Sequence, residues 1–491
     1  MKTNMTSNIS PKWQFDNSYL TLPPAFYSFQ QPSMVNSPQM VLFNTPLAKS
    51  LGLEFLNSQI DQTTLELSGN ITPEGAQPIA QAYAGHQYGH FTMLGDGRTI
   101  LLGEQITPTG ERFDIQLKGS GRTPYSRRGD GKATLRAMLR EYLLSEAMVH
   151  LNIPTSRSLA VVASQDEVWR EEVHQGAILT RVMKSHIRIG TFEYAAHYGT
   201  RPDLEKLTYY VIQRHYPEIL DAENPPLELL KAVAIKQIDL ILDWMRVGFI
   251  HGVMNTDNTS ISGETFDYGP CAFMNNYNPR TVYSSIDHYG RYAFQNQSAI
   301  IFWNLSILAD ALQPLIHKDA YKSEVMIKEL FHTLQAEYYD KRYLMMFKKI
   351  GIVSPRKEDN ALIDNLMQWM YDHKADYTNT FSALLNPDQF PTHPIHSESG
   401  QSWVAQWRSI VNNQDGGFEA AKGLMETQNP FYIPRNQIVE QVLDQAVKGD
   451  LSDLELWLQI LKNPYQLQEV DIRYLFGIED FRTEYKTYCG T

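Results

Sequence analysis

The most constraining feature of this sequence is a long apolar helix pattern that runs directly into a polar loop. Residues 227–247 place aliphatic side chains three and four positions apart, which predicts a helix with a broad buried face. The loop that follows, residues 251–270, reads HGVMNTDNTSISGETFDYGP. Such a helix would hold the start of this loop at the edge of a hydrophobic core. The polar side chains that we expect to lie close together there are His251, Asp257, Asn258 and Asp267.

The spacing inside this loop is similar to that of the catalytic and metal loops of protein kinases. Kinase catalytic loops read H-x-D-x-x-x-x-N, with the Asp as base and the Asn on a metal ion. On that frame His251 and Asn258 take the His and Asn positions, whereas Val253 stands where a kinase has its Asp. Asp257 offers a carboxylate one residue before Asn258, and Asp267 fits a second metal ligand. The loop therefore indicates either an inactive, pseudokinase-like protein or a kinase-like site with different chemistry.

A strand, a glycine-rich loop and a helix occur earlier in the chain in the order of a kinase small lobe. Residues 112–118 alternate apolar and polar side chains, which predicts a strand that ends at Lys118. Helical spacing follows over residues 132–151 and includes Glu141. In kinases the strand lysine holds phosphates and pairs with the helix glutamate. We therefore predict a Lys118–Glu141 ion pair; the alternative is a surface glutamate paired within its own helix.

Two motifs upstream have competing interpretations. The GDGR tetrapeptide at residues 95–98 precedes a strand-like run, so it indicates either a tight hairpin turn or a phosphate-binding loop. His86 and His90 are four residues apart, as in helical metal sites, but the glycine between them weakens a helix. We favour hydrogen-bonded structural histidines over metal ligands.

Basic residues concentrate around the same segment. The formal net charge of the chain is −12, yet seven basic residues fall between positions 118 and 140, and Asp130 is the one acid among them. Further along, Arg181 and Arg188 are close enough in sequence to meet in space. Arginine is preferred where planar, bidentate recognition of phosphate is needed. The alternatives are a solvated basic surface and a phosphate-binding site.

The whole chain is predicted to be an α+β protein with a kinase-like, two-lobed fold. Residues 1–75 would form a mostly irregular N-terminal extension, packed on the core, with one short helix near Pro46–Leu51. Residues 76–185 would form a small nucleotide-binding lobe. Residues 186–491 would form an enlarged, mostly helical lobe with the catalytic and metal loops and the C-terminal tail. Methionine and aromatic side chains of this helical half are expected in its core.

Composition excludes several classes of protein. The net charge of −12 and a pI near 5.6 argue against general affinity for nucleic acid. We find no run of about 18 apolar residues and no secretory signal at the N-terminus, which predicts a cytoplasmic protein without a membrane partner. No coiled-coil heptad is evident, so we expect a monomer. Two cysteines, Cys271 and Cys489, are too few for a disulfide scaffold.

Four segments together resemble a known family. They are FDNSY near residue 15, AGHQYGHFTMLGDGR, QLKGSGRTPYSRRGDGKATLRAMLREYLLSEAM and the loop of residues 251–270. These long motifs are similar to those of selenoprotein O (SelO), a family of kinase-like protein adenylyltransferases. The resemblance implies a kinase-like fold with ATP flipped relative to ordinary kinases, and transfer of AMP to Ser, Thr or Tyr hydroxyls of proteins. UMP transfer from UTP is also attributed to the family.

The resemblance also implies roles for individual residues. The nucleotide would contact Gly95, Gly97, Arg98, Lys118, Asp130, Gly131, Arg181, Arg188 and Asp267. Asp257 would be the catalytic base, Asn258 and Asp267 would bind Mg²⁺ or Mn²⁺, and Glu141 would pair with Lys118. Family members often carry a redox-active residue near the C-terminus, which suggests the hypothesis of a reversible Cys271–Cys489 disulfide. The alternative is two free thiols.

Three functions therefore compete. The first is AMP transfer to protein substrates, with UMP transfer as a variant. The second is conventional phosphoryl transfer within the same fold, and the third is a non-catalytic nucleotide-binding scaffold, suggested by Val253.

Overall fold

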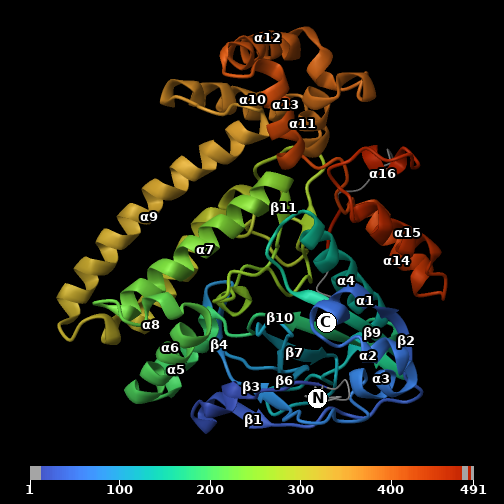
Figure 1. Ribbon diagram of the computed structural model, residues 1–491, viewed down its shortest axis with the longest axis vertical. Helices are drawn as coiled ribbons and strands as arrows, with labels where there is room; N and C mark the ends of the chain where they lie inside the picture. The colour runs from blue at the N-terminus through green and yellow to red at the C-terminus, as the bar shows by residue number, and fades with distance from the viewer. Residues whose placement is uncertain (1–12, 478–484, 488–491) are drawn as a thin grey trace, which may run out of the picture.

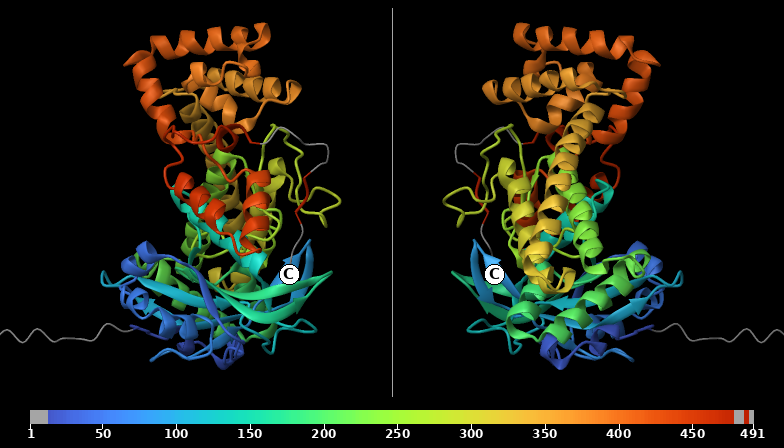
Figure 2. Two further views of the ribbon diagram at one scale, coloured as in Figure 1. Left: turned by 90° about the vertical axis from the view of Figure 1, so that its right-hand side faces the viewer. Right: turned by 90° about the vertical axis from the view of Figure 1, so that its left-hand side faces the viewer.

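A computed structural model describes residues 13–477 and 485–487 (Figure 1). It is an α+β protein in which an antiparallel sheet occupies one end and helices make up the C-terminal half. The side views show the long helices rising from the sheet toward a helical group at the far end (Figure 2). The strand order of the main sheet is β1-β3-β6-β7-β10-β9-β2, with β8 paired to β10. Its strands are β1 (Tyr27–Phe29), β2 (Gln39–Phe43), β3 (Ile79–Gln81), β6 (Thr99–Ile106), β7 (Arg112–Lys118), β8 (Ala133–Thr134), β9 (Arg157–Trp169) and β10 (Val173–Met183).

The middle of the sheet carries the residues that matter most for the site. β7 has the predicted bounds, and its Ile115 and Leu117 side chains are fully buried. In the register of the sheet, Lys118 lies opposite Thr99 of β6 and Leu179 of β10. The end of β7 is therefore held between two strands, beside the GDGR loop that leads into β6.

The helix predicted after β7 is α4 (Leu135–His150). Thr134 caps its N-terminus by accepting a hydrogen bond from the backbone N–H of Ala137 at 3.3 Å. Its apolar side packs on β9 and β10, which places Glu141 on the sheet side of the helix. The helix ends before Asn152, whose φ of 58° takes the chain out of the helical conformation.

The N-terminal segment contains more regular structure than expected. The predicted short helix is α1 (Thr45–Ser50), and it is followed by α2 (Phe55–Ser58) and α3 (Ile60–Leu67). β1 and β2 form the two edges of the main sheet. Their partners, β3 and β9, lie far away in sequence, so no local pattern could identify them.

A separate hairpin excludes two of the alternatives drawn from the sequence, a helical metal pair at His86 and His90 and a hairpin turn at the GDGR segment. β4 (Ala84–Gln87) pairs with β5 (His90–Met93) in a two-stranded sheet. His86 and His90 therefore lie on strands, and the helical metal pair is excluded. β5 does not pair with β6, so the GDGR segment is a loop between two sheets and not a hairpin turn.

The helical half is built around α7 (Pro225–Val247), the helix predicted from the apolar pattern. It ends at Gly248 and leads into β11 (Phe249–Ile250), which pairs with β12 (Ala272–Phe273). The other helices are α5 (Ile189–Tyr198), α6 (Arg201–His215), α8 (Gln297–Ile316), α9 (Ala320–Lys349), α10 (Asn360–Asp372), α11 (Tyr377–Leu385), α12 (Glu398–Asn413), α13 (Gly417–Gln428), α14 (Asn436–Ala446), α15 (Ser452–Leu461) and α16 (Arg473–Phe476).

One helix is more apolar than expected from the absence of a continuous run of about 18 apolar residues. The segment Phe294–Ile316, which contains α8, is long and apolar enough to cross a membrane by length and composition, with a mean hydropathy of 1.5. In the structure α8 packs against α5, α7 and α9. Half of its most apolar window is buried inside the protein.

Candidate active site

A pocket of about 670 Å³ opens between the main sheet and the loop that carries Asp267. Its wall is formed by the GDGR loop, the end of β7, the loop after β7, β10 and the segment before α5. All nine residues that the resemblance assigns to the nucleotide lie in this wall: Gly95, Gly97, Arg98, Lys118, Asp130, Gly131, Arg181, Arg188 and Asp267. Asp257 and Asn258 are not among the residues that line this pocket.

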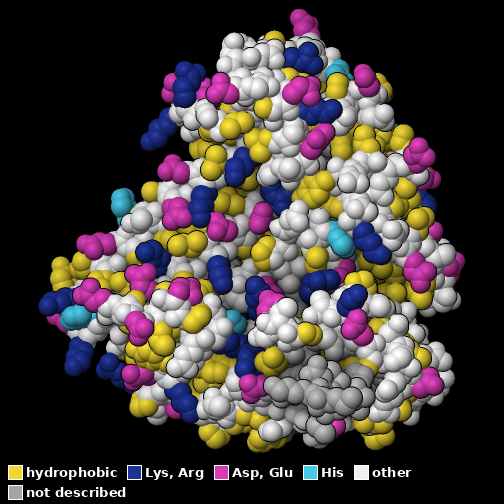
Figure 3. All heavy atoms as spheres, in the orientation of Figure 1, with side chains coloured by type: hydrophobic (Ala, Val, Ile, Leu, Met, Phe, Trp, Pro, Cys, Tyr) yellow, Lys and Arg dark blue, Asp and Glu magenta, His cyan; other side chains and the backbone are white. Residues whose placement is uncertain are grey.

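The wall is strongly cationic. Eight basic side chains contribute to it: Arg98, Lys118, Arg127, Arg128, Lys132, Arg170, Arg181 and Arg188. Three acids, Asp96, Asp130 and Asp267, accompany them. Lys and Arg side chains gather along the boundary between the sheet and the helices above it (Figure 3). In a chain of net charge −12, this concentration favours a polyanionic ligand.

A buried ion network joins β7, α4, β10 and residues 266–269, the predicted metal loop. The Lys118 Nζ donates to Glu141 Oε2 at 2.6 Å, which is the predicted pair, and also to Asp267. Arg181 adds a contact that the sequence did not predict, because its Nε donates to Glu141 Oε1 at 2.9 Å. Its Nη2 lies 3.3 Å from Asp267 Oδ1. Two cations and two carboxylates therefore alternate at the back of the pocket.

The network keeps both carboxylates ionised. Burial alone would raise the pKa of Glu141, but the charges of Arg181 and Lys118 outweigh burial and hold that pKa below its usual value. Asp267 is about a third exposed (32%). Burial would also raise its pKa, but Lys118, Arg181 and Arg98 hold it well below the usual value. Asp267 thus presents a permanent negative charge to the pocket.

Arg188 connects the pocket to residues 251–258, the predicted catalytic loop. Its Nη1 donates to the backbone carbonyl of Asp257 at 3.1 Å, and its Nε donates to the His186 carbonyl at 3.1 Å. The guanidinium lies 4.0 Å from the centre of the Tyr83 ring and 5.0 Å from that of Phe266. These cation–π contacts and hydrogen bonds fix the guanidinium in the wall.

His251 links the catalytic loop to the metal loop. Its Nε2 donates to the carbonyl of Phe266 at 3.0 Å, directly before Asp267. Its Nδ1 accepts from the backbone N–H of Val253 at 3.4 Å. Burial lowers the pKa of His251, consistent with a neutral ring with one donor and one acceptor. The histidine therefore has a structural role between the two loops.

Asp257 lies under the β4–β5 hairpin. His86 N donates to Thr256 Oγ1 at 2.8 Å and Tyr88 N donates to Asn255 Oδ1 at 3.1 Å, so the hairpin is fastened to the catalytic loop. The Asp257 Oδ1 atom is buried and has no hydrogen-bond partner among the described residues. Burial raises the pKa of Asp257 to about 7, although Arg188 acts in the opposite direction.

Asn258 and Asp267 carry oxygen donors of the kind that a hard divalent cation prefers. The Asn258 Nδ2 donates to the Val253 carbonyl at 3.0 Å, and within residues 13–477 and 485–487 no group donates a hydrogen bond to its amide oxygen. Asp267 adds an ionised carboxylate. Mg²⁺ and Mn²⁺ prefer oxygen ligands of this kind, and Mg²⁺ is commonly held by one or two protein groups plus phosphate oxygens. The donor set is therefore compatible with the metal that the resemblance implies.

Two glycines of the wall are required by close packing. Gly95 has a φ of 124°, and a methyl group there would overlap the Tyr125 ring. Gly131 has a φ of 71°, and a methyl group there would overlap the backbone of Gly121. The carboxylate of Asp130, next to Gly131, bonds Arg170 at 2.8 Å and is 41% exposed.

The resemblance implies that this pocket binds ATP, and we expect Gly95→Ala to weaken that binding about tenfold, because the strained backbone and the displaced Tyr125 ring distort the pocket. Gly110→Ala is the matched control, since Gly110 also has a positive φ, of 83°, but no atom lies within 4 Å of the added methyl group. Titration calorimetry with ATP measures both variants. Equal affinities would show that the GDGR loop does not shape the nucleotide site.

Sequence reasoning missed several residues of the site. Tyr83 and Phe266 hold Arg188, and Glu193 of α5 accepts hydrogen bonds from both His86 and Thr256. The Glu193 contact confirms His86 as a structural histidine. These residues carry no motif of their own, and only the tertiary structure brings them to the loop.

Cys271 directly follows the metal loop and is fully buried. Burial raises the pKa of its thiol to about 12, so the thiol is protonated at neutral pH. Cys489 lies outside the described residues, and the Cys271–Cys489 disulfide stays a prediction.

Comparison with known proteins matches the sequence of this chain to one family. Residues 11–462 match the family model described as protein adenylyltransferase SelO. A protein of Brevibacillus brevis named protein nucleotidyltransferase YdiU is 50% identical over 490 residues, covering 100% of both chains. Proteins with the same name from Nitrosococcus oceani and Bacillus cereus are 49% identical, over 481 residues (98% of this chain and 97% of the relative) and 488 residues (99% and 100%).

Proposed function

The chain belongs to the SelO family of protein adenylyltransferases, and from this premise we propose how it works. The enzyme transfers AMP from ATP to Ser, Thr or Tyr hydroxyls of proteins and releases pyrophosphate. The nucleotide lies in a kinase-like site, flipped relative to ordinary kinases, and transfer depends on Mg²⁺ or Mn²⁺. UMP transfer from UTP is a second activity of the same site.

The observation that carries this proposal is the convergence of Lys118, Arg181 and Arg188 on one pocket beside Asp267. A volume of about 670 Å³ suits a nucleotide, because ligand pockets commonly span ~300–1,000 Å³. Phosphates of ATP would replace the intramolecular partners that these cations have in the ligand-free protein. The kinase-like arrangement is supported by the Lys118–Glu141 pair and by the His251 bridge between the two loops.

In the proposed reaction the acceptor hydroxyl oxygen forms a bond to the α-phosphorus. The bond from that phosphorus to the oxygen bridging to the β-phosphate breaks, and pyrophosphate leaves. The hydroxyl proton passes to the carboxylate of Asp257, whose Oδ1 has no described partner. Arg181 and Arg188 stabilise the negative charge that develops on the leaving group.

Asn258 and Asp267 are the residues that would hold the metal ion. When bound, such an ion supplies positive charge next to the phosphate oxygens. Lys118, which pairs with Glu141 and Asp267 in the ligand-free protein, would bind a phosphate oxygen of the nucleotide.

ATP labelled in either the α- or the γ-phosphate tests the proposed reaction. With Mg²⁺ or Mn²⁺ and a mixture of acceptor proteins, we expect protein-bound label only from the α-position, and none after addition of EDTA. Label only from the γ-position would establish a conventional kinase. ATP binding without any transfer would establish a scaffold, and α-labelled UTP tests UMP transfer in the same assay.

A further inference from the structure

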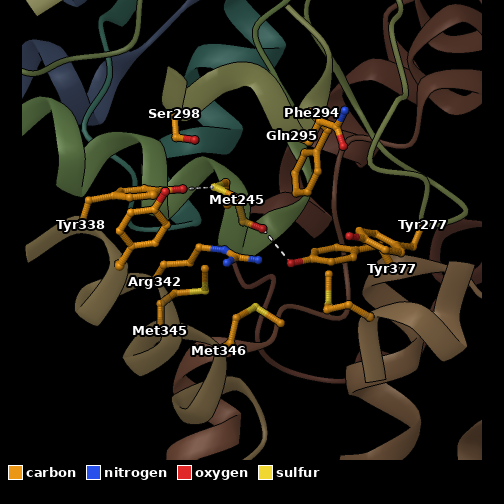
Figure 4. Close-up of a pocket in the computed structure, with 12 residues that line it drawn as sticks. Met245, Tyr277, Phe294, Gln295, Ser298, Tyr338, Arg342, Met345, Met346 and Tyr377 are labelled. Atoms are coloured by element: carbon orange, nitrogen blue, oxygen red, sulfur yellow. Dashed lines mark hydrogen bonds between the residues drawn. The ribbon is translucent and has the colours of Figure 1, made fainter. Parts of the chain in front are cut away.

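A second cavity lies in the helical half, beside the C-terminal end of α7 (Figure 4). It has a volume of about 200 Å³ and shares no lining residue with the candidate active site. Its wall comes from α7, α8, α9, α10, α11 and the segment between β12 and α8. The lining residues are Met245, Tyr277, Phe294, Gln295, Ser298, Tyr338, Tyr339, Arg342, Met345, Met346, Met367 and Tyr377.

The lining combines an adaptable apolar surface with one charge. Four methionines and five aromatic rings make up most of it, and methionine adjusts readily to the shape of a ligand. The Tyr377 hydroxyl donates to the Met245 carbonyl at 2.8 Å, and the Tyr338 hydroxyl contacts the Met245 sulfur at 3.8 Å. These contacts, drawn in Figure 4, satisfy both hydroxyls on the wall.

Arg342 is the single charged side chain of the lining. It extends from α9 toward the middle of the cavity, between Tyr338 and Tyr377 (Figure 4). Its neighbour Lys341 pairs with Asp239 and Glu337 at 2.8 Å, whereas in the described part of the chain no carboxylate forms a salt bridge with Arg342. The Arg342 guanidinium lies 5.4 Å from the centre of the Tyr343 ring. Arg342 is partly exposed, so its guanidinium is hydrated in the ligand-free cavity and is available to form a charge-assisted pair with an anionic ligand.

The size of the cavity limits the ligand. A cavity of roughly 150 Å³ accommodates benzene, so about 200 Å³ has room for a ring or short chain with a small polar group. Tyr339 is 58% exposed, so the cavity has a solvent-facing margin through which such a molecule can enter.

We propose that this cavity binds a small carboxylic acid with an aromatic ring or a short apolar chain. The apolar part contacts the methionines and tyrosines, and the carboxylate forms a charge-assisted pair with Arg342. Met245 of the lining lies near the end of α7, which β11 connects to His251 along the chain. The inference is independent of the nucleotide that the enzyme transfers.

Binding of 3-phenylpropionate to the full-length protein tests the proposal, with its uncharged analogue 3-phenylpropanol for comparison. Titration calorimetry should show binding of the acid, and at least roughly tenfold weaker binding of the alcohol. Arg342→Gln should weaken binding of the acid by a similar factor and leave that of the alcohol nearly unchanged. Lys348→Gln, on an exposed position of the same helix, is the matched control and should bind like the wild type.

Hydrogen exchange locates the bound acid. We expect protection around Met245 and along α9 near Arg342. Protection at Lys118 and Arg181 instead would place the acid among the cations of the nucleotide pocket and overturn the proposal. Absence of binding to the wild type, or equal affinity of Arg342→Gln and wild type for the acid, would also overturn it. The alcohol titration shows whether the Arg342→Gln cavity is intact.

Discussion

Replacement of Asp267 by alanine is expected to lower AMP transfer by at least a hundredfold, roughly the loss caused by removing one group that stabilises a transition state. Asp267 is the proposed metal ligand, and Lys118, Arg181 and Arg98 keep it ionised. Its loss removes the carboxylate for the metal and leaves Lys118 paired to Glu141 alone. Transfer of label from α-labelled ATP, measured at saturating Mg²⁺ and Mn²⁺, gives the size of the effect.

Two further variants test whether the loss of transfer is specific to the charge of Asp267. Asp267→Asn keeps the shape of the side chain and removes its charge, so it should lose transfer while the protein stays folded by circular dichroism. Asp388→Ala removes an exposed carboxylate in the helical half and should retain full activity. Unchanged transfer by Asp267→Ala would remove the assignment of residues 266–269 as the metal loop.

The local sequence pattern was sufficient to predict the strand and the helix that form the back of the pocket. Alternation predicted β7 with its final Lys118, and helical spacing predicted α4 with Glu141. The order of these elements then predicted their ion pair. Arg181 was predicted to lie near Arg188, but its contact with Glu141 was not predicted. That contact depends on the register between β10 and β7. Such a register is set by contacts between distant strands, which a single sequence does not specify.

The surroundings of Asp257 show a second limit of sequence reasoning. Its proximity to Asn258 was evident, but its cover by the β4–β5 hairpin was not. That cover depends on hydrogen bonds between residues about 170 positions apart, such as His86 N to Thr256 Oγ1. The methionines around Arg342 are a similar case, since their spacing indicated a packed core, and only the tertiary structure shows the cavity between the helices.

Replacement of Glu141 by alanine is expected to destabilise the protein by about 3–5 kcal/mol, the typical cost of breaking a buried ion pair from one side. Glu141 lies between Lys118 and Arg181, and the side chains of all three are 4% exposed. Without the carboxylate, two cations stay buried with only the partly exposed Asp267 as a shared partner. Denaturant unfolding at neutral pH measures the loss in the free energy of unfolding.

A glutamate with exposed partners provides the control. Glu324 pairs with Lys328 on the surface of α9, and the two side chains are 52% and 73% exposed, so Glu324→Ala should leave the free energy of unfolding nearly unchanged.

The pH dependence of stability adds an independent check with Glu141→Gln. Because the pKa of Glu141 in the folded protein is held below its usual value, its charge stabilises the fold above the titration of an unfolded glutamate, near pH ~4.3. This stabilisation is lost as the pH falls toward the folded-state pKa. The difference in stability between wild type and Glu141→Gln should therefore be constant near neutrality and shrink in acid. A difference independent of pH would show that packing, and not the charge of Glu141, stabilises this part of the fold.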